Sequence, residues 1–188
     1  MRILMPVLHY YPIIGGLEAW TQNIAERLAN QAEIFIVTAR VGDSAKYEVK
    51  NGVKIYRTSL FNLGDLSYSS PVHILTALPF IFFKSFSLIF SQKINLLHCQ
   101  GFLGAFLGYS ISKIIGIPYI VTVQRLEGKS LLKKIVYRNA KICIAASLAI
   151  KKYFEEIGCK NVEIIPNGVD LKRFQNLKRR KKEGFIVM

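Results

Sequence analysis

Residues 1–38 read MRILMPVLHYYPIIGGLEAWTQNIAERLANQAEIFIVT. The first apolar run, residues 3–8, is followed by a loop that ends in two glycines. Over residues 17–30 apolar side chains recur every three or four positions, which is the period of one helix face. Residues 33–38 form a β-rich run whose centre, residues 34–37, is continuously apolar, which is typical of a strand buried on both faces of a parallel sheet. This stretch therefore predicts a strand, a glycine loop, a helix and a second strand.

The rest of the chain continues this alternation. Residues 47–57 centre on Asn51-Gly52, a pair typical of a hairpin or of a tight turn before a strand at 53–56. Further strands are predicted at residues 94–99, 119–123, 142–145 and 162–165, and helices at about 102–115, 131–139 and 148–157. Strands alternating with helices predict an α/β fold, a Rossmann-like parallel sheet with helices on both faces. Ligands of such sheets bind at the carboxyl ends of the strands.

Residues 72–90 are almost continuously apolar and are long enough to span a bilayer. His73 and Lys84 would be costly in hydrocarbon, and Pro79 would break a helix near its middle. We therefore expect a buried or interfacial helix pair, bent at Pro79, rather than a transmembrane helix.

The chain has 188 residues, 51% of them hydrophobic, and a formal net charge of +14, a composition that excludes a disordered polyampholyte. Residues 1–100 hold nine Lys/Arg and six Asp/Glu, whereas residues 101–188 hold seventeen and six. The excess concentrates at residues 129–141 and 172–182. Such runs are typical of solvated faces and linkers, and they also fit an anionic membrane surface. No nucleic-acid reader motif accompanies them, so no nucleic-acid partner is expected.

The three cysteines have no C-x-x-C spacing, which argues against a disulfide framework and a zinc site. The apolar run that precedes Pro6 is too short for the core of a signal peptide. Both observations predict a cytoplasmic protein.

The loop after the first strand is the richest candidate site. Gly15 and Gly16 stand before a helix, where small residues let a ligand approach and free N–H groups favour a phosphate. A tight turn is the alternative interpretation. The chain has neither a G-x-G-x-x-G nor a Walker motif, which argues against dinucleotide-binding and P-loop proteins.

Other strand ends supply further candidates. His98 is followed by Gln100 and Gly101, although a lone histidine there is more often structural than catalytic. Gln124 and Arg125 follow the strand at 119–123. Asn167 precedes a glycine, a pair that by itself indicates a turn.

Four segments together resemble a known family. They read His9-x-x-Pro12-x-x-Gly15-Gly16-x-Glu18, Asn95-Leu96-Leu97-His98, Pro118-Tyr119-Ile120-Val121-Thr122 and Ile165-Pro166-Asn167-Gly168-Val169-Asp170-x-x-x-Phe174. In order and spacing they resemble the N-terminal domain of retaining GT-B glycosyltransferases, the nucleotide-sugar-dependent family 4 group of the bacterial cell-envelope type. The resemblance spans nearly the whole chain.

The resemblance implies two facing Rossmann-like domains, with the nucleotide-sugar donor held mainly by the C-terminal one. The N-terminal domain would bind the acceptor, with Gly15 and Gly16 near the donor diphosphate. The substrate-binding residues it implies are His9, Gly15, Gly16, Glu18, His98, Arg125 and Asn167. Neither a metal nor a cofactor is implied, because helix dipoles and basic side chains stabilise the leaving diphosphate.

This sequence departs from the family's pattern in two places. Gln124 stands where many relatives have a histidine close to the transferred sugar. Glutamine donates and accepts hydrogen bonds but carries no proton charge, so this candidate catalytic residue either orients the sugar or marks an altered activity. In addition, residues 184–188 resemble the first strand of a second domain that the chain lacks. We thus expect a domain at 1–176, and a basic linker with that strand at 177–188.

The expected function is the acceptor-binding half of a glycosyltransferase that acts at the inner membrane surface on a lipid-linked or cell-envelope acceptor. The C-terminal domain would follow in cis or be a partner chain, and this half would be inactive alone. A non-catalytic scaffold that pairs with a separate C-terminal chain is the main alternative. An epimerase-like GT-B relative and a dehydrogenase or flavodoxin-like protein are less favoured.

Overall fold

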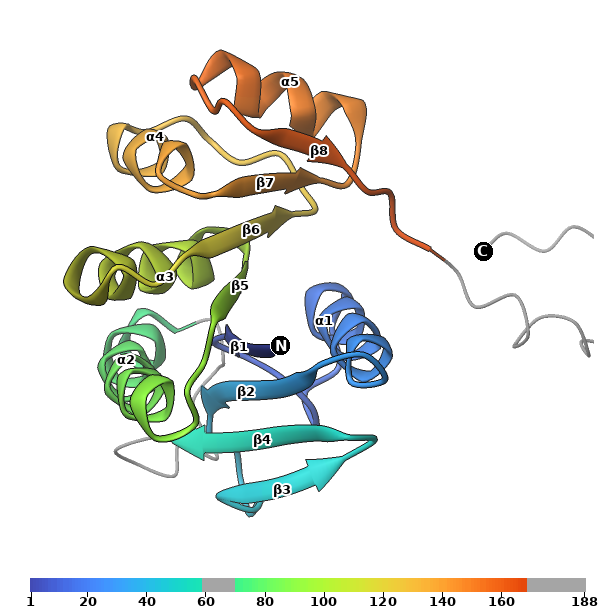
Figure 1. The fold of residues 1–188 in the computed structure, drawn as a ribbon, viewed down its shortest axis with the longest axis vertical. Coiled ribbons are helices and arrows are strands. Elements are labelled where there is room, and N and C mark those ends of the chain that lie inside the picture. Colours follow the sequence, from blue (N-terminus) through green and yellow to red (C-terminus); the bar gives the residue numbers. More distant parts are fainter. Residues whose placement is uncertain (59–69, 169–188) are drawn as a thin grey trace, which may run out of the picture.

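The computed structural model describes residues 1–58 and 70–168. These residues form one sheet with helices on both faces (Figure 1). The strands are β1 (Arg2–Pro6), β2 (Glu33–Ala39), β3 (Tyr47–Lys50), β4 (Val53–Thr58), β5 (Leu96–Gln100), β6 (Tyr119–Val123), β7 (Ile142–Ala145) and β8 (Val162–Ile164). The helices are α1 (Gly16–Leu28), α2 (Pro71–Ser91), α3 (Gly101–Ile115), α4 (Leu131–Arg138) and α5 (Leu148–Glu156). The sequence segments predicted at 169–188 lie outside the described residues.

The eight strands lie in the order β3-β4-β2-β1-β5-β6-β7-β8. All neighbouring strands pair in parallel except β3 and β4, which are antiparallel. The α/β fold with a mainly parallel sheet is therefore confirmed. Because the order reverses between β1 and β5, the loops after these strands diverge, and a crevice forms at their carboxyl ends.

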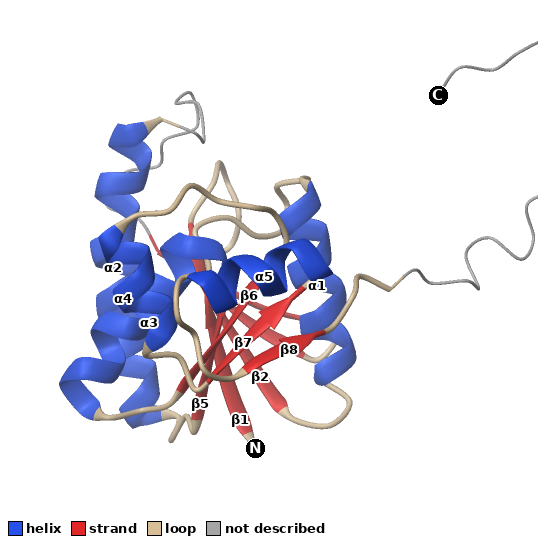
Figure 2. Cartoon of the chain, turned by 90° about the horizontal axis from the view of Figure 1, so that it is seen from above, coloured by secondary structure: helices blue, strands red, loops and turns tan. Residues whose placement is uncertain are grey.

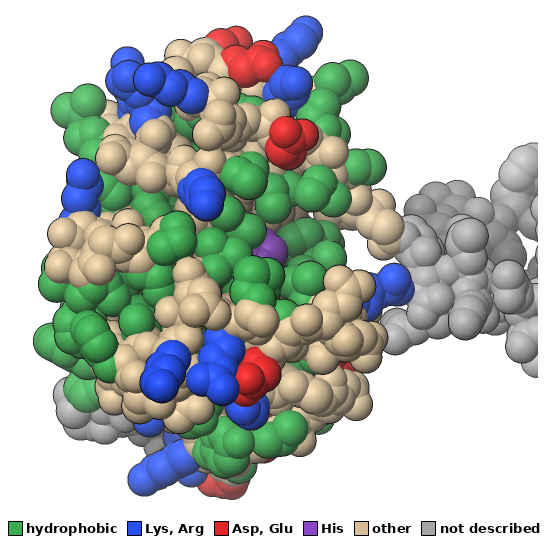
Figure 3. Space-filling view, viewed as in Figure 1, with side chains coloured by type: hydrophobic (Ala, Val, Ile, Leu, Met, Phe, Trp, Pro, Cys, Tyr) green, Lys and Arg blue, Asp and Glu red, His purple; other side chains and the backbone are tan. Residues whose placement is uncertain are grey.

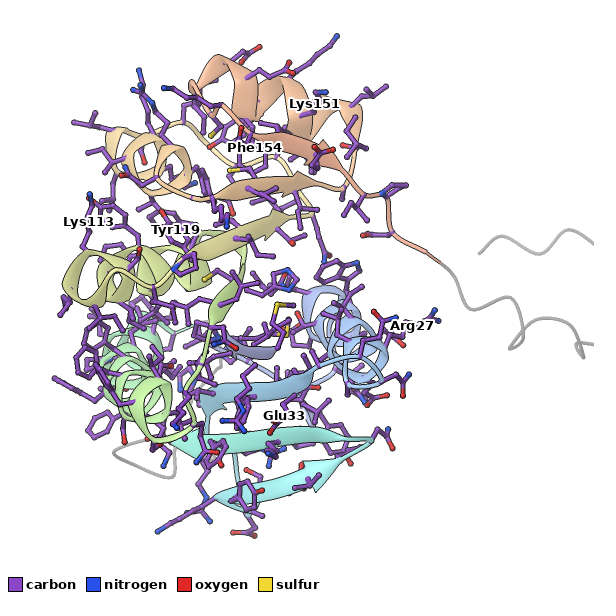
Figure 4. The ribbon with its side chains drawn as sticks, in the orientation of Figure 1. Arg27, Glu33, Lys113, Tyr119, Lys151 and Phe154 are labelled. Carbon is purple, nitrogen blue, oxygen red and sulfur yellow. The ribbon has the colours of Figure 1, made fainter. Side chains whose placement is uncertain are left out.

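Alternate residues of the central strands feed two cores. Ile3 and Met5 of β1 pack with Ala25 of α1 on one face. Leu4 points to the opposite face, where residues of α2, α3, α4 and α5 form the larger core. Tyr119 and Phe154 belong to this larger core, between the sheet and its helices (Figure 4). The apolar strands are thus buried on both faces, as their continuous hydrophobicity predicts.

The apolar segment forms one helix, α2, and the predicted helix pair is wrong. The Ser70 hydroxyl accepts a hydrogen bond from the Val72 N–H, and Pro71 occupies the first helical position, where a missing N–H costs nothing. The helix continues through Pro79, which lies on its exposed side. Burial of the opposite side offsets the missing hydrogen bond; its buried residues are His73, Ala77, Ile81, Ser85, Leu88 and Ile89.

Helix α2 also has an apolar exposed side, with Val72, Leu75, Phe83 and Phe90 more than half exposed. By length and composition it is the one described helix that is able to cross a membrane, and 28% of its most apolar 18-residue window is buried. A core helix of a soluble protein passes the same test, so this is weak support for a membrane span.

The Asn51-Gly52 pair makes a hairpin, which settles the two alternatives left by the sequence. Asn51 and Gly52 have φ values of 49° and 80°, the positive values that a two-residue hairpin turn requires. Lys50 pairs with Val53, so β3 becomes an antiparallel edge strand.

Candidate functional site

A cleft of about 840 Å³ opens at the carboxyl ends of β1, β5 and β6. It lies between the first turns of α1 and α3, the loop after β1 and the loop after β6. Parallel sheets bind ligands in this position because loops diverge there and helix N-termini point inward. Lys and Arg side chains lie scattered over the molecular face in Figure 3, so the basic excess does not gather into one patch there.

Five of the predicted site residues line this cleft: His9, Gly16, Glu18, Gln124 and Arg125. They come from the loop after β1, the start of α1 and the loop after β6. Gly15 lies next to them as the residue that precedes α1. The tertiary structure therefore brings together side chains that are more than 100 residues apart in the sequence.

His98 and Asn167 are not among the cleft-lining residues. His98 lies inside β5, is 5% exposed, and its Nε2 atom is 2.9 Å from the Thr122 hydroxyl. Burial lowers the pKa of His98 to about 4, so its imidazole is neutral near pH 7. Asn167 is exposed after β8. A substrate contact of either residue remains a prediction.

The two glycines of the first loop have different surroundings. A Cβ atom on Gly15 would collide with the carboxylate of Glu18, whereas one on Gly16 would meet no atom within 4 Å. The Glu18 carboxylate is also 3.9 Å from His9 Nδ1. A carboxylate in the first turn is favourable because the N-terminus of a helix carries partial positive charge. The absence of a side chain at Gly15 therefore leaves room for the Glu18 carboxylate. The absence of one at Gly16 leaves the backbone there accessible from the cleft.

His9 is held between two elements at the cleft wall. Its ring stacks on that of His73 from α2, with 5.3 Å between the ring centroids. His73 is buried, and burial lowers its pKa. The stacked pair links the loop after β1 to α2.

The opposite wall contains a charge-paired group that the sequence did not single out. Lys133 Nζ lies 3.3 Å from Glu127 Oε2, and the Tyr137 hydroxyl donates a 2.8 Å hydrogen bond to the same carboxylate oxygen. Lys133 Nζ also lies 5.4 Å from the centre of the Phe102 ring. Lys133 belongs to the basic run at 129–141, but it is neutralised by Glu127 rather than free.

Gln100 is a further cleft residue that sequence reasoning missed. It ends β5, is 4% exposed, and lines the cleft. Neither atom of its side-chain amide has a hydrogen-bond partner in the described residues. Its only sequence signal was its place two residues after His98, at a strand end.

The part of the chain that the structure describes contains no group of three or more His, Cys, Asp or Glu side chains able to hold a metal ion. The three cysteines are free thiols. The polar chemistry of the cleft thus comes from amides, two carboxylates, an imidazole and two basic side chains.

Residues 14–173 match the model of the family described as Glycosyltransferase Family 4. The chain belongs to glycosyltransferase family 4. Its resemblance to the N-terminal domain of GT-B glycosyltransferases is confirmed by this match and by the fold.

The family 4 domain is similar to several larger proteins. An uncharacterized glycosyltransferase of Methanocaldococcus jannaschii is 30% identical over 132 residues, which are 68% of this chain and 32% of that protein. Sucrose-phosphate synthase from Thermosynechococcus elongatus superposes with a TM-score of 0.72 at 16% identity, over 91% of this chain and 49% of the synthase. The structure of Anabaena HepE in complex with UDP-glucose superposes with a TM-score of 0.63 at 18% identity, over 92% of this chain and 45% of HepE. The chain thus spans about a third of the curated relative and about half of each solved structure.

Proposed function

We propose that this domain is the acceptor-binding half of a glycosyltransferase that moves a sugar from a nucleotide-sugar donor to a lipid-linked or cell-envelope acceptor. The observation that carries the proposal is the cleft at the carboxyl ends of β1, β5 and β6, in a chain that belongs to glycosyltransferase family 4. A structural neighbour, HepE, is in complex with UDP-glucose, which supports a nucleotide sugar as donor.

In this proposal the open backbone at Gly16 and the N-terminus of α1 face the donor diphosphate. Arg125 lines the same cleft, is exposed, and is a substrate-binding residue in this proposal. Gln124 orients the transferred sugar through hydrogen bonds. Transfer is retaining and independent of metal and cofactor, and the donor is held mainly by a C-terminal domain in cis or on a partner chain.

We also propose a cytoplasmic location at the inner face of the membrane. Helices α2 and α4 lie on the same side of the sheet (Figure 2), and both expose apolar side chains, such as Phe83 and Leu131. A second cavity, of about 480 Å³, is lined by Leu131, Lys134, Ile135, Arg138, Asn139, Gly158 and Lys160. Apolar side chains beside basic ones suit an anionic lipid surface.

A non-catalytic scaffold half remains the second candidate, and Gln124 favours it. A glutamine at the position of a family histidine cannot carry a proton charge. In the complete two-domain protein, a Gln124→His variant that gains activity would favour the altered-activity view. Unchanged kinetics would favour a role in orienting the sugar.

The test is a titration of the ¹⁵N-labelled 188-residue chain with UDP-glucose, followed by amide chemical shifts, together with a sugar-transfer assay on the same chain. We expect weak binding with shifts at Gly15 and Gly16, and no transfer. Transfer by this chain alone would contradict the half-enzyme proposal. Absence of shifts in the first loop at millimolar UDP-glucose would contradict the proposed donor contact.

A further inference from the structure

The N-terminus of α3 differs from the other described helix N-termini. Serine hydroxyls, of Ser70, Ser130 and Ser147, cap α2, α4 and α5, and the Glu18 carboxylate lies in the first turn of α1. Helix α3 has neither a side-chain cap nor an acidic residue in its first turn. Its first residues, Gly101 to Gly104, line the cleft instead. Unsatisfied N–H groups at a helix start attract an anion.

Gln100 supplies an independent observation at the same place. The residue precedes α3 without capping it, is 4% exposed, lines the cleft, and has both side-chain amide atoms buried and unpaired among the described residues. Buried polar atoms are nearly always hydrogen-bonded, because leaving them unpaired costs free energy. A ligand that binds in the cleft therefore explains why this amide is kept buried and unpaired at the cleft wall.

Basic side chains stand beside this pair of features. Arg125 lines the cleft, is exposed, and makes no hydrogen bond or ion pair with the residues that the structure describes. Its guanidinium can therefore bind an oxyanion through two parallel hydrogen bonds. Lys133 lies over the ring of Phe102 in the first turn of α3, although Glu127 shares its charge.

We propose that Gln100, Arg125 and the first turn of α3 bind the phosphate of a phosphorylated sugar or polyol on the acceptor. The backbone N–H groups and the guanidinium donate to phosphate oxygens, as does Nε2 of Gln100. Oε1 of Gln100 accepts from a neighbouring hydroxyl, which selects a phosphate ester over a bare anion. This inference rests on the proposed function and names its acceptor class. The α1 N-terminus is left for the donor.

The experiment titrates the ¹⁵N-labelled 188-residue chain with inorganic phosphate, with glucose 6-phosphate and with phosphatidylinositol phosphate in mixed micelles. We expect shifts of the amides of residues 101–104, with glucose 6-phosphate or the lipid binding more tightly than inorganic phosphate. Tighter binding of glucose 6-phosphate would identify a soluble phosphorylated acceptor, and tighter binding of phosphatidylinositol phosphate a lipid-borne one. Silence of these amides in all three titrations would overturn the inference.

Variants separate binding from folding. Arg125→Ala and Gln100→Leu should each weaken the phosphate ester about tenfold, since each removes hydrogen bonds to a charged group. Lys141→Ala removes an exposed charge that precedes β7, at the opposite end of the sheet, and should bind like the wild type. Affinities of both cleft variants equal to that of the wild type would contradict the proposal.

Gln100→Leu also distinguishes a ligand contact from a structural role. Because the amide makes no hydrogen bond in the described chain, the ligand-free variant should melt at or a few degrees above the wild type, as expected when a buried unpaired polar group is removed. A melting temperature lowered by several degrees would indicate a structural role and count against the inference. Chemical shift changes at Gly15 and Gly16 on addition of UDP-glucose test the proposed function separately. The proposed function and the phosphate site can therefore be contradicted independently of each other.

Discussion

Gly15 and Gly16 are neighbours in sequence, and the structure gives them separate roles. Gly15→Ala would displace the Glu18 carboxylate from its position beside His9. Gly16→Ala would place a methyl group in open space within the cleft. The pair therefore offers a matched test of ligand contact at the residue scale.

We predict that Gly16→Ala changes the free energy of unfolding by less than about 1 kcal/mol, since alanine suits a helix start at least as well as glycine. The same variant should weaken UDP-glucose binding, because the added methyl group lies where the donor would approach. Chemical denaturation and the UDP-glucose titration measure the two effects. Unchanged UDP-glucose affinity would show that Gly16 does not face the donor.

His98 predicts how stability depends on pH. Its folded-state pKa of about 4 lies below the ordinary value of 6.5, so the unfolded chain binds the proton more tightly. The contribution of neutral His98 to the free energy of unfolding is therefore fully present above about pH 6.5 and is lost as the pH falls towards 4. The loss attributable to this buried group is about 3 kcal/mol.

Urea denaturation at pH 7.5, 6 and 4.5 measures this dependence, with His98→Gln as the comparison. The variant keeps a hydrogen-bonding side chain that does not titrate in this range, so its pH profile should be flatter. His73, whose pKa burial also lowers, should leave part of the slope in the variant. Identical slopes for both proteins would contradict the assignment to His98.

At the scale of one element, α2 shows how tertiary packing overrides a local breaker. Pro79 lacks the N–H that would bond within the helix, yet the helix continues because its opposite face is buried against the sheet. The proline itself is on the exposed side. It therefore weakens the helix without contributing to the core.

We predict that Pro79→Ala raises the free energy of unfolding by about 1–3 kcal/mol, because alanine restores a backbone hydrogen bond and the steric fit of the helix. Chemical denaturation measures the change. Ile81→Ala, two residues further and fully buried, is the matched control and should lower it by about 2–5 kcal/mol. A Pro79→Ala variant less stable than the wild type would indicate that the helix needs its proline.

At the scale of the whole molecule, charge and exposed apolar surface together bear on membrane association. The net charge is +14, and α2 and α4 expose apolar side chains on one side of the sheet. If this side meets the membrane, electrostatic and apolar contributions should be separable by salt and by mutation.

We predict that the chain co-sediments with phosphatidylglycerol vesicles in about 50 mM salt and dissociates largely at about 300 mM, since salt screens exposed charges. Phe83→Ser should weaken binding at low salt without loss of stability. Val49→Ser, on the β3 edge, removes a similarly exposed apolar side chain and should have no effect. Equal binding by both variants would contradict a membrane role for α2.

The sequence by itself determined the order of elements, the mainly parallel sheet and the loops in which the site would lie. Helix and strand periodicities depend on residues that are close in the sequence, so they can be recognised before the tertiary structure is known. The motif at His9 to Glu18 likewise acts locally, at the start of one helix. The fold class followed from these local signals, and the family from four motifs whose order and spacing span nearly the whole chain.

Only the tertiary structure decided which side chains meet. The His98 ring lies within hydrogen-bond distance of Thr122, and Lys133 forms an ion pair with Glu127. The Gln100 side chain is buried beside the cleft without a hydrogen-bond partner among the described residues. Burial of one face against the sheet also decided that α2 runs through Pro79. These outcomes depend on β1 lying beside β5 and on which face of each strand a helix covers. Such contacts join residues far apart in the sequence, where no local pattern records them.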